Sequence, residues 1–414
     1  MFNFNNINWA LLDQALVSGV NFLSGILLAR LLGLTDYGVF TLLWMMVLFL
    51  NNIQYALIMS PMMSLRPETY NISSRMFYSS FSVLQLVYSF ASLIVVASVM
   101  VVLSGIDAFG ISSDVILPLV CVTVFYQVQE FFRRYFFSNK MFVVAFTSDV
   151  ISYFGQIVLF ILAAYLNEFS LVTALWLIAC TSLIAILYSI PRFVKISIDI
   201  DVYKMIYIKN WSYSKWLVAT SIMQWFSGHF FIFITGIVLG VTSVGAVKSA
   251  LNIVGVLHIL FQGLENVIPV EASKWYIKHG AIKLQSYISQ VLLYTVLGTI
   301  AISIPILLFP KDIMGYLYGN SFVEYYYLLY WCVAIYVVMS FGLSLKVALR
   351  TINSTRSIFI AQSITGVITL FTSYMLADMF GLHGVMFGLL LINIVFISVL
   401  YFSYKKTIKM KLTN

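Results

Sequence analysis

Charged side chains are scarce in this chain. Asp, Glu, Lys and Arg together make up 9% of its 414 residues, whereas hydrophobic residues make up 62%. The mean hydropathy is +0.99, too high for a soluble domain to bury its apolar surface. The apolar runs are about 20 residues long and do not alternate in segments of about ten, which favours membrane-spanning helices over a membrane β-barrel. We therefore expect an all-α integral membrane protein.

Cysteines are few and catalytic motifs are missing. Cys121, Cys180 and Cys332 lie inside apolar runs, which is typical of small buried hydrophobes and not of a disulfide framework or a metal site. The chain has no Gly-x-x-x-x-Gly-Lys-Ser/Thr, no His-Glu-x-x-His and no Gly-x-Ser-x-Gly. We predict that it is not an enzyme and needs no cofactor or metal. Because the chain has no P-loop, any energy that it uses would come from an ion gradient, from downstream consumption of a substrate or from a partner.

Twelve apolar spans are predicted. They run over about 8–29, 39–60, 77–103, 115–132, 142–165, 170–190, 212–238, 246–269, 284–309, 325–347, 357–378 and 383–404. No loop between them is long enough to form a soluble domain. The longest loop, 191–211, joins the sixth span to the seventh. We therefore predict an N-terminal six-helix bundle over 1–190, a cytoplasmic linker over 191–211 and a C-terminal six-helix bundle over 212–414.

The basic residues predict the orientation of these spans. If both termini lie in the cytoplasm, nineteen of the 23 Lys and Arg residues fall on the cytoplasmic side, and only Arg30 and Lys311 fall in loops on the other side. This bias follows the positive-inside rule. We expect a multi-pass protein with both termini in the cytoplasm. The net charge of +8 arises from these short loops and does not indicate nucleic-acid binding.

A short pattern, Leu-Gly-x-Thr-x-x-Gly, occurs twice. Residues 32–38 match residues 239–245, an offset of 207 in a chain of 414. Residues 134–140 also match residues 350–356 through Arg-x-x-x-Ser-x-Lys/Arg, although chance and the positive-inside rule would produce that match as well. Six spans is an even number, so the two halves share one orientation. This predicts a parallel repeat about an axis along the membrane normal.

The first copy of the pattern lies in a longer stretch, 26–40, with an Ala-Arg pair, a Leu-Gly pair and then a Tyr-Gly pair. The residues concerned are Ala29, Arg30, Leu32, Gly33, Tyr37 and Gly38. This stretch resembles the opening of Wzx-type O-antigen and polysaccharide flippases of the multidrug/oligosaccharidyl-lipid/polysaccharide exporter (MOP) superfamily. The resemblance implies two pseudo-symmetric six-helix bundles around a central cavity.

The same resemblance implies a function in lipopolysaccharide or related surface polysaccharide biosynthesis. Such a flippase moves an undecaprenyl-diphosphate-linked oligosaccharide from the cytoplasmic to the periplasmic leaflet of the bacterial inner membrane by alternating access. The implied partners are the lipid-linked oligosaccharide, the lipid bilayer, a glycan polymerase and a chain-length regulator, with no nucleic acid.

Polar residues inside the apolar runs are the candidate substrate-binding groups, because such groups are costly in a bilayer without water or a partner. They are Lys248, Asn252, His258 and Gln262 in span eight, Asn21 and Asn52 in the first two spans, Gln224 and His229 in span seven, and Arg30 beyond span one. Those in span eight follow or flank one helical face. The alternative is that these groups form hydrogen bonds between helices.

Arg30 and Lys248 are the cations deepest on the periplasmic side of each half. We predict that they contact the diphosphate, arginine through paired hydrogen bonds and lysine as a point charge. Arg30 would alternatively extend to the lipid headgroups, and Lys248 would alternatively pair with a carboxylate of another helix.

Four acids lie in or near spans: Asp13, Glu130, Asp149 and Glu265. We predict that Asp13 or Glu265 binds a coupling proton or sodium ion. Asp13 would alternatively be solvated near a membrane end, and Glu265 would alternatively pair with a lysine or histidine. The positive-inside rule accounts for Arg133 at the cytoplasmic end of span four.

Two rival functions remain open. A cation-coupled multidrug exporter of the same superfamily would have a carboxylate-rich pocket, whereas this chain offers Lys248, Arg30 and two histidines. A membrane glycan polymerase would need a large extramembrane loop, and the longest loop on the predicted periplasmic side is only about 309–324. The flippase prediction fits the repeat and the cations best.

Overall fold

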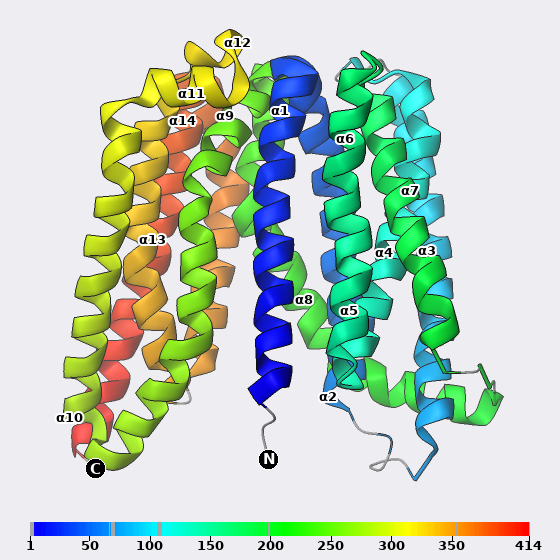
Figure 1. Ribbon diagram of the computed structural model, residues 1–414. Coiled ribbons are helices and arrows are strands. Elements are labelled where there is room, and N and C mark those ends of the chain that lie inside the picture. Colours follow the sequence, from blue (N-terminus) through cyan, green and yellow to red (C-terminus); the bar gives the residue numbers. More distant parts are fainter. Residues whose placement is uncertain are drawn as a thin grey trace. The chain divides into compact units, whose positions relative to one another are not determined.

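A computed structural model describes residues 4–65, 67, 71–105, 110–194, 196–197, 199–352 and 354–413. Its regular elements are α1 (Phe4–Gln54), η1 (Tyr55–Met59), α2 (Ser60–Ser64), α3 (Ser74–Gly105), η4 (Ser113–Val115), α4 (Ile116–Ser138), α5 (Phe142–Asp149), η5 (Val150–Phe154), α6 (Gly155–Tyr165), α7 (Leu171–Ser189), η6 (Ile190–Arg192), α8 (Ile200–Leu239), α9 (Val241–Val254), α10 (Val256–Leu308), α11 (Pro310–Tyr318), α12 (Asn320–Val323), α13 (Leu328–Thr351) and α14 (Thr355–Thr413). The elements of the described residues are thus all helical (Figure 1).

The prediction of twelve membrane crossings is confirmed. Nine helices of the described residues are long and apolar enough to cross a membrane. Leu12–Ser64, with 53 residues, would be about 80 Å long if straight, and it turns at Gly33 (φ 74°) into two arms. Arg356–Thr407 likewise divides at Gly381. α9 and the first arm of α10, which ends at Gly280, supply the remaining crossing.

The chain divides into two compact units. Unit 1 comprises Met1–Leu32 and Val39–Ile222, and unit 2 comprises Gly33–Gly38 and Met223–Asn414. The short segment Gly33–Gly38 therefore belongs to unit 2, although the chain on both sides of it belongs to unit 1.

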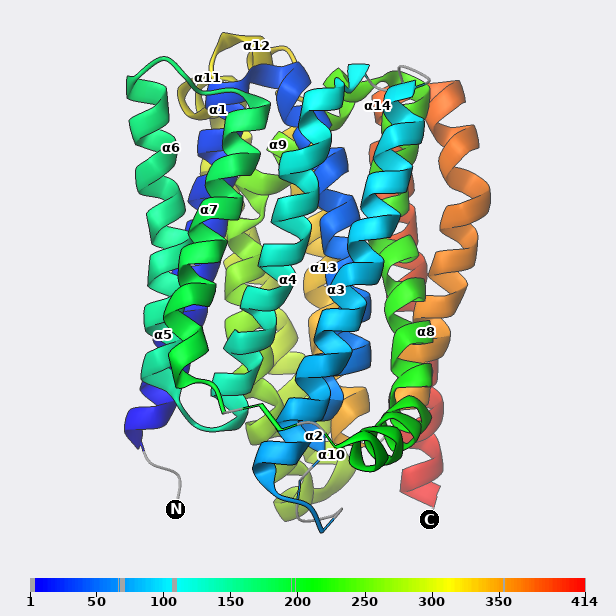
Figure 2. The ribbon, with the colours of Figure 1, turned by 90° about the vertical axis from the view of Figure 1, so that its right-hand side faces the viewer.

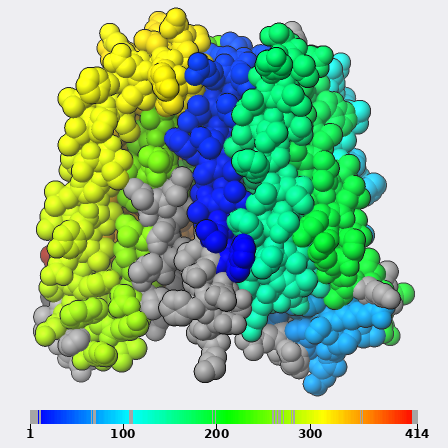
Figure 3. Space-filling view, in the orientation of Figure 1, coloured from blue at the N-terminus to red at the C-terminus, as the bar shows by residue number. Residues whose placement is uncertain are grey.

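Unit 1 is organised around α4, which packs against α3 and α7 (Figure 2). Phe77 and Phe81 of α3 and Phe136 of α4 are fully buried in its hydrophobic core. The first arm of α1 lies beside α5 and α6 (Figure 3), where Val17 and Tyr153 share a smaller core cluster.

Buried glutamines also connect the helices of unit 1. The Nε2 group of Gln54 donates hydrogen bonds to Oε1 of Gln85 at 2.7 Å and to the carbonyl of Gln127 at 2.8 Å. Gln127 in turn donates from Nε2 to Oγ of Ser92 at 3.1 Å. Polar groups inside a membrane need such partners, so Gln54 has a structural explanation here.

Unit 2 is organised around α13, which packs against α10, α14 and α9. Leu284 of α10, Val347 of α13 and Leu400 of α14 are fully buried in its core. This core is apolar, and the described ion pairs other than one surface lysine–glutamate pair all lie in unit 1.

The two copies of the duplicated pattern adopt the same backbone conformation. Gly33 has φ 74° and ψ 178°, and Gly240 has φ 82° and ψ 167°. A side chain is strained at such positive φ values, which explains glycine at both sites. Two residues on, the hydroxyls of Thr35 and Thr242 lie 3.4 Å apart.

The two copies also pack against each other within unit 2. A Cβ atom on Gly38 would overlap the backbone carbonyl of Val241, and a Cβ atom on Gly245 would overlap the backbone carbonyl of Leu34. The final glycine of each copy therefore lets two helices approach to backbone contact. The repeated pattern is a self-complementary helix contact.

Candidate functional site

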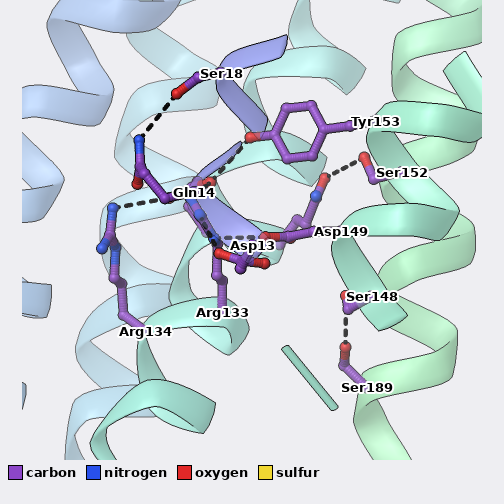
Figure 4. A network of polar contacts seen from close by, with 12 residues as sticks. Asp13, Gln14, Ser18, Arg133, Arg134, Ser148, Asp149, Ser152, Tyr153 and Ser189 are labelled. Carbon is purple, nitrogen blue, oxygen red and sulfur yellow. Dashed lines mark hydrogen bonds and ion pairs between the residues drawn. The ribbon is translucent and has the colours of Figure 1, made fainter. Parts of the chain in front are cut away.

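The most highly charged buried region of the described chain is centred on Arg133 of α4, in unit 1. Its guanidinium Nη2 lies 2.6 Å from Oδ2 of Asp13 and its Nε lies 2.6 Å from Oδ2 of Asp149. Its Nη1 lies 3.4 Å from Oε1 of Glu130. Figure 4 shows the acids of α1 and α5 converging on the arginine. The side chains of Arg133, Asp13 and Asp149 are 7%, 1% and 0% exposed.

Local helix geometry places two of these groups. Glu130 and Arg133 are three residues apart on α4, so their side chains share one face. Asp149 ends α5 where the five-residue π-helix η5 begins, and such wider turns are frequent at functional sites. The hydroxyl of Tyr153, within η5, donates to Oε1 of Glu130 at 3.2 Å.

The network carries more acid than base. Arg134 also reaches Glu130, with 3.7 Å between Nη2 and Oε2. Three carboxyl groups thus face two guanidinium groups, which leaves one excess negative charge if all are ionised. The carboxyl groups of Asp13 and Asp149 each lie 2.6 Å from the Arg133 guanidinium. A proton on one of the three carboxyl groups would cancel the excess negative charge.

The role assigned to Arg133 from the sequence needs correction. The predicted span four ended at residue 132, and Arg133 was explained by the positive-inside rule. α4 instead continues to Ser138, and Arg133 is buried. Asp13 is also buried and is not merely solvated. The signal in the sequence was the three acids in or near spans, because a carboxylate inside a membrane needs a partner and an arginine at the end of a span can be one.

A second candidate site surrounds Lys248 on α9, in unit 2. Lys248 is half-buried, and His229 of α8 is within its electrostatic range. The Trp225 ring packs against that histidine with centroids 5.9 Å apart. One turn beyond Lys248, Nδ2 of Asn252 is 3.4 Å from the hydroxyl of Tyr318. No ion pair between described side chains includes Lys248.

Five other predicted residues are exposed on the structure. Asn21, Arg30, Asn52, Gln224 and His258 are exposed side chains on their helices. The polar face predicted along span eight is interrupted, because α9 ends at Val254 and α10 begins only after Gly255.

Two further predicted residues, Gln262 and Glu265, have side chains outside the described residues. Lys248, His229 and Asn252 are therefore the substrate candidates that the described side chains bring into one neighbourhood. Whether any of them binds substrate stays a prediction.

Comparison with solved structures shows a fold shared along almost the whole chain. An inward-facing multidrug resistance MATE family transporter of the MOP superfamily matches 97% of this chain and 96% of its own, with a TM-score of 0.75 and 15% identity. The lipid II flippase MurJ, in an inward closed conformation, matches 97% of this chain and 88% of its own, with a TM-score of 0.69 and 16% identity. The resemblance to the MOP superfamily is confirmed in the fold.

Comparison with curated sequences gives a shorter match. The probable low-salt glycan biosynthesis flippase Agl15 of Haloferax volcanii is 27% identical over 173 residues, which are 42% of this chain and 37% of that protein. The match therefore spans less than half of either protein. No protein-family model matches the chain.

Proposed function

We propose that this chain, which has the fold of MOP-superfamily transporters, is a flippase for lipid-linked glycans. Its substrate is an oligosaccharide on undecaprenyl diphosphate, an O-antigen or related surface polysaccharide repeat unit. The protein moves it from the cytoplasmic to the periplasmic leaflet of a bacterial inner membrane by alternating access, and a glycan polymerase and a chain-length regulator act on the product. The names of two similar proteins, a glycan biosynthesis flippase and a lipid II flippase, support this class of cargo.

The observation that carries the proposal is the environment of Lys248. A half-buried ammonium group in an apolar helix is costly without an anion, and no described carboxylate pairs with it. A diphosphate supplies that anion, because a lysine–phosphate contact is a charge-assisted hydrogen bond. Asn252 follows Lys248 by one helical turn and supplies an amide, and Trp225, packed against His229, supplies an aromatic ring; both groups suit a sugar. A cationic drug would be repelled here, which disfavours the multidrug-exporter function.

Arg30 is proposed to contact the diphosphate at another stage of its passage. It is exposed at the end of the first arm of α1, and its guanidinium is suited to paired phosphate contacts. The other polar candidates, including Asn21, Asn52 and Gln224, would contact the glycan hydroxyls.

Coupling to a proton is proposed at Asp13. Its carboxyl group shares the Arg133 network with Asp149 and Glu130, where three carboxyl groups face two guanidinium groups. Binding and release of that proton change the net charge of the network, and a charge change inside a bilayer is a strong driving force for rearrangement. Glu265 stays a second candidate for ion coupling.

The test is to delete the gene in its host and locate the lipid-linked glycan. Surface glycan is measured together with undecaprenyl-linked units, and a membrane-impermeant lectin reports the leaflet in which those units lie. We expect surface polymer to be lost and single units to be trapped on the cytoplasmic face.

Other outcomes would point to the rival functions. Units that reach the periplasmic face but remain unpolymerised would indicate a polymerase. Unchanged surface glycan with new drug sensitivity would indicate a multidrug exporter.

A further inference from the structure

The first part of α8, Ile200–Trp216, is named here the base segment. In Figures 1 and 2 the beginning of α8 runs across the lower ends of the unit 1 helices. The segment belongs to unit 1, which extends to Ile222. Because the same helix continues directly into a membrane-spanning stretch, the base segment must lie at the level of a membrane surface.

One face of the base segment is fastened to unit 1. Ile206, Asn210 and Ser214, spaced four residues apart, are 4%, 1% and 0% exposed. Nδ2 of Asn210 donates to the carbonyl of Leu57 at 2.9 Å, and Oγ of Ser214 lies 3.4 Å from the same carbonyl. Leu57 is inside the π-helix η1. These bonds determine which face of the segment points outward.

The outward face is a stripe of apolar residues and lysines. Ile200, Ile208 and Trp211 are 66%, 67% and 50% exposed. Lys204 and Lys215 are also exposed, and the spacing of three or four residues places all five on one side of the helix. Exposed isoleucine and tryptophan interleaved with lysine are typical of helices that lie in a membrane interface. The lysine stems can lie along acyl chains while the ammonium groups reach phosphate.

The charge of this face is complementary to anionic lipid. Oδ1 of Asp199 accepts hydrogen bonds from the backbone N–H groups of Asp201 and Val202 at 3.0 and 3.2 Å, at the start of α8. Over 199–216 three exposed lysines, Lys204, Lys209 and Lys215, outnumber the two exposed acids, Asp199 and Asp201, and of the five only Lys204 and Lys215 lie on the apolar stripe. A basic apolar face of this kind is attracted to anionic headgroups.

We propose that the base segment is a docking surface for the anionic headgroup layer of the membrane, with Ile208 and Trp211 inserted among the lipids. The lysines raise the local fraction of anionic lipid around the base segment. A different face of the same helix, through Asn210 and Ser214, contacts the π-helical turn that contains Leu57. Headgroup binding is therefore connected to a membrane-spanning helix through two side chains.

The test uses a fluorescent label at position 208 in the full-length chain. Ile208→Cys is introduced after Cys121, Cys180 and Cys332 are replaced by alanine, and a bimane is attached. The protein is reconstituted in liposomes that contain brominated phosphatidylglycerol or, at equal mole fraction, brominated phosphatidylcholine. We expect quenching by both lipids, and stronger quenching by the anionic one. Each basic residue near an anionic surface contributes about fivefold in binding, so the preference should be at least about twofold.

Two lysine variants identify the source of the preference. K204Q/K209Q/K215Q should abolish the preference for phosphatidylglycerol but keep the quenching. K274Q/K278Q/K283Q, which removes equal charge from exposed lysines of α10, should leave the preference unchanged. Absence of quenching by either lipid would overturn the proposal, because position 208 would then face water or another protein. Equal quenching by the two lipids, or equal loss in both variants, would overturn the role of the three lysines.

Discussion

The two units share a sequence pattern and a number of spans, yet their buried charges are opposite in kind. In unit 1 buried carboxylates and arginines pair with one another around Arg133. At the offset of 216 that aligns Arg134 with Arg350, unit 2 has Leu349 in place of Arg133 and Thr365 in place of Asp149. Thr365 makes a hydroxyl pair with Ser227 at 2.9 Å. Among the described side chains, the buried ion network is therefore found in unit 1 and has no counterpart in unit 2.

The reverse holds for the second site. Lys248 of unit 2 corresponds, at the offset of 207, to Thr41 of unit 1. Thr41 is buried, whereas Lys248 is half-buried and has no described ion-pair partner. Unit 1 therefore holds buried charges that pair with each other, whereas the described ion pairs of unit 2 do not include Lys248. The proposed function assigns ion coupling to the first site and cargo binding to the second, so the comparison teaches where two related units differ.

The largest effect on stability is expected when Arg133 of unit 1 is replaced by leucine, the residue that unit 2 has at the matching position. R133L leaves three buried carboxyl groups without their central partner, and losing one member of a buried ion pair costs about 3–5 kcal/mol in the free energy of unfolding. Thermal unfolding in detergent, followed by size-exclusion fluorescence, measures this loss. R134L is the matched control, because the Arg134 side chain is 28% exposed and lies at the edge of the network. Equal destabilisation by both variants would contradict a central role for Arg133.

Replacing the network as a whole should restore most of that stability. D13T/R133L/D149T introduces the residues found one repeat later in the chain, Thr220 at the offset of 207 and Leu349 and Thr365 at the offset of 216, and leaves Glu130 balanced by Arg134. Removing buried partners together is much less costly than removing one, so about 2–4 kcal/mol should return relative to R133L. Transport by this variant should no longer respond to a pH gradient in proteoliposomes. A triple variant as unstable as R133L would show that the acids have other structural roles.

For Lys248 of unit 2 we expect the reverse outcome: its substitution should reduce transport and leave the stability of the protein unchanged. K248Q removes a charge that has no described carboxylate partner, so the unfolding temperature should stay the same. Hydrogen bonds to charged groups contribute about 1.5–3 kcal/mol, so transport of lipid-linked glycan should fall by about tenfold or more. Leaflet-resolved transport in proteoliposomes measures this, with K248R as the charge-preserving control. A large drop in unfolding temperature would instead reveal a structural partner of Lys248.

The smallest effect is expected at the contact where the repeated patterns meet. G38A would force the added Cβ atom against the backbone of Val241, and overpacking of this kind costs about 1–3 kcal/mol. G245A should behave alike, because its Cβ atom would meet Leu34. G19A, where nothing lies within 4 Å of the added atom, is the control and should be neutral by thermal unfolding. Equal unfolding temperatures for G38A, G245A and G19A would contradict a close helix contact at Gly38 and Gly245.

Much of the fold was predictable because membrane insertion is read from local hydropathy. Each span needs about 20 apolar residues whatever its neighbours are, so the twelve crossings could be placed without knowledge of packing. The predicted span ends were less accurate. At α4 the charged Arg133 suggested that the span ends, although the helix continues and the arginine pairs with buried acids. Of the candidate site residues, Asp13 and Lys248 were found as polar groups in apolar runs, while Arg133 was attributed to topology.

The sequence by itself determined the membrane class, the number of spans and the existence of a repeat, because composition, hydropathy and the 207-residue offset are properties of the chain alone. Only the tertiary structure decided what the special residues contact. Asp13 and Arg133 are 120 residues apart in the chain, and Gly38 and Gly245 are 207 apart. Their contacts depend on which faces of separate helices meet, and no local pattern encodes that choice.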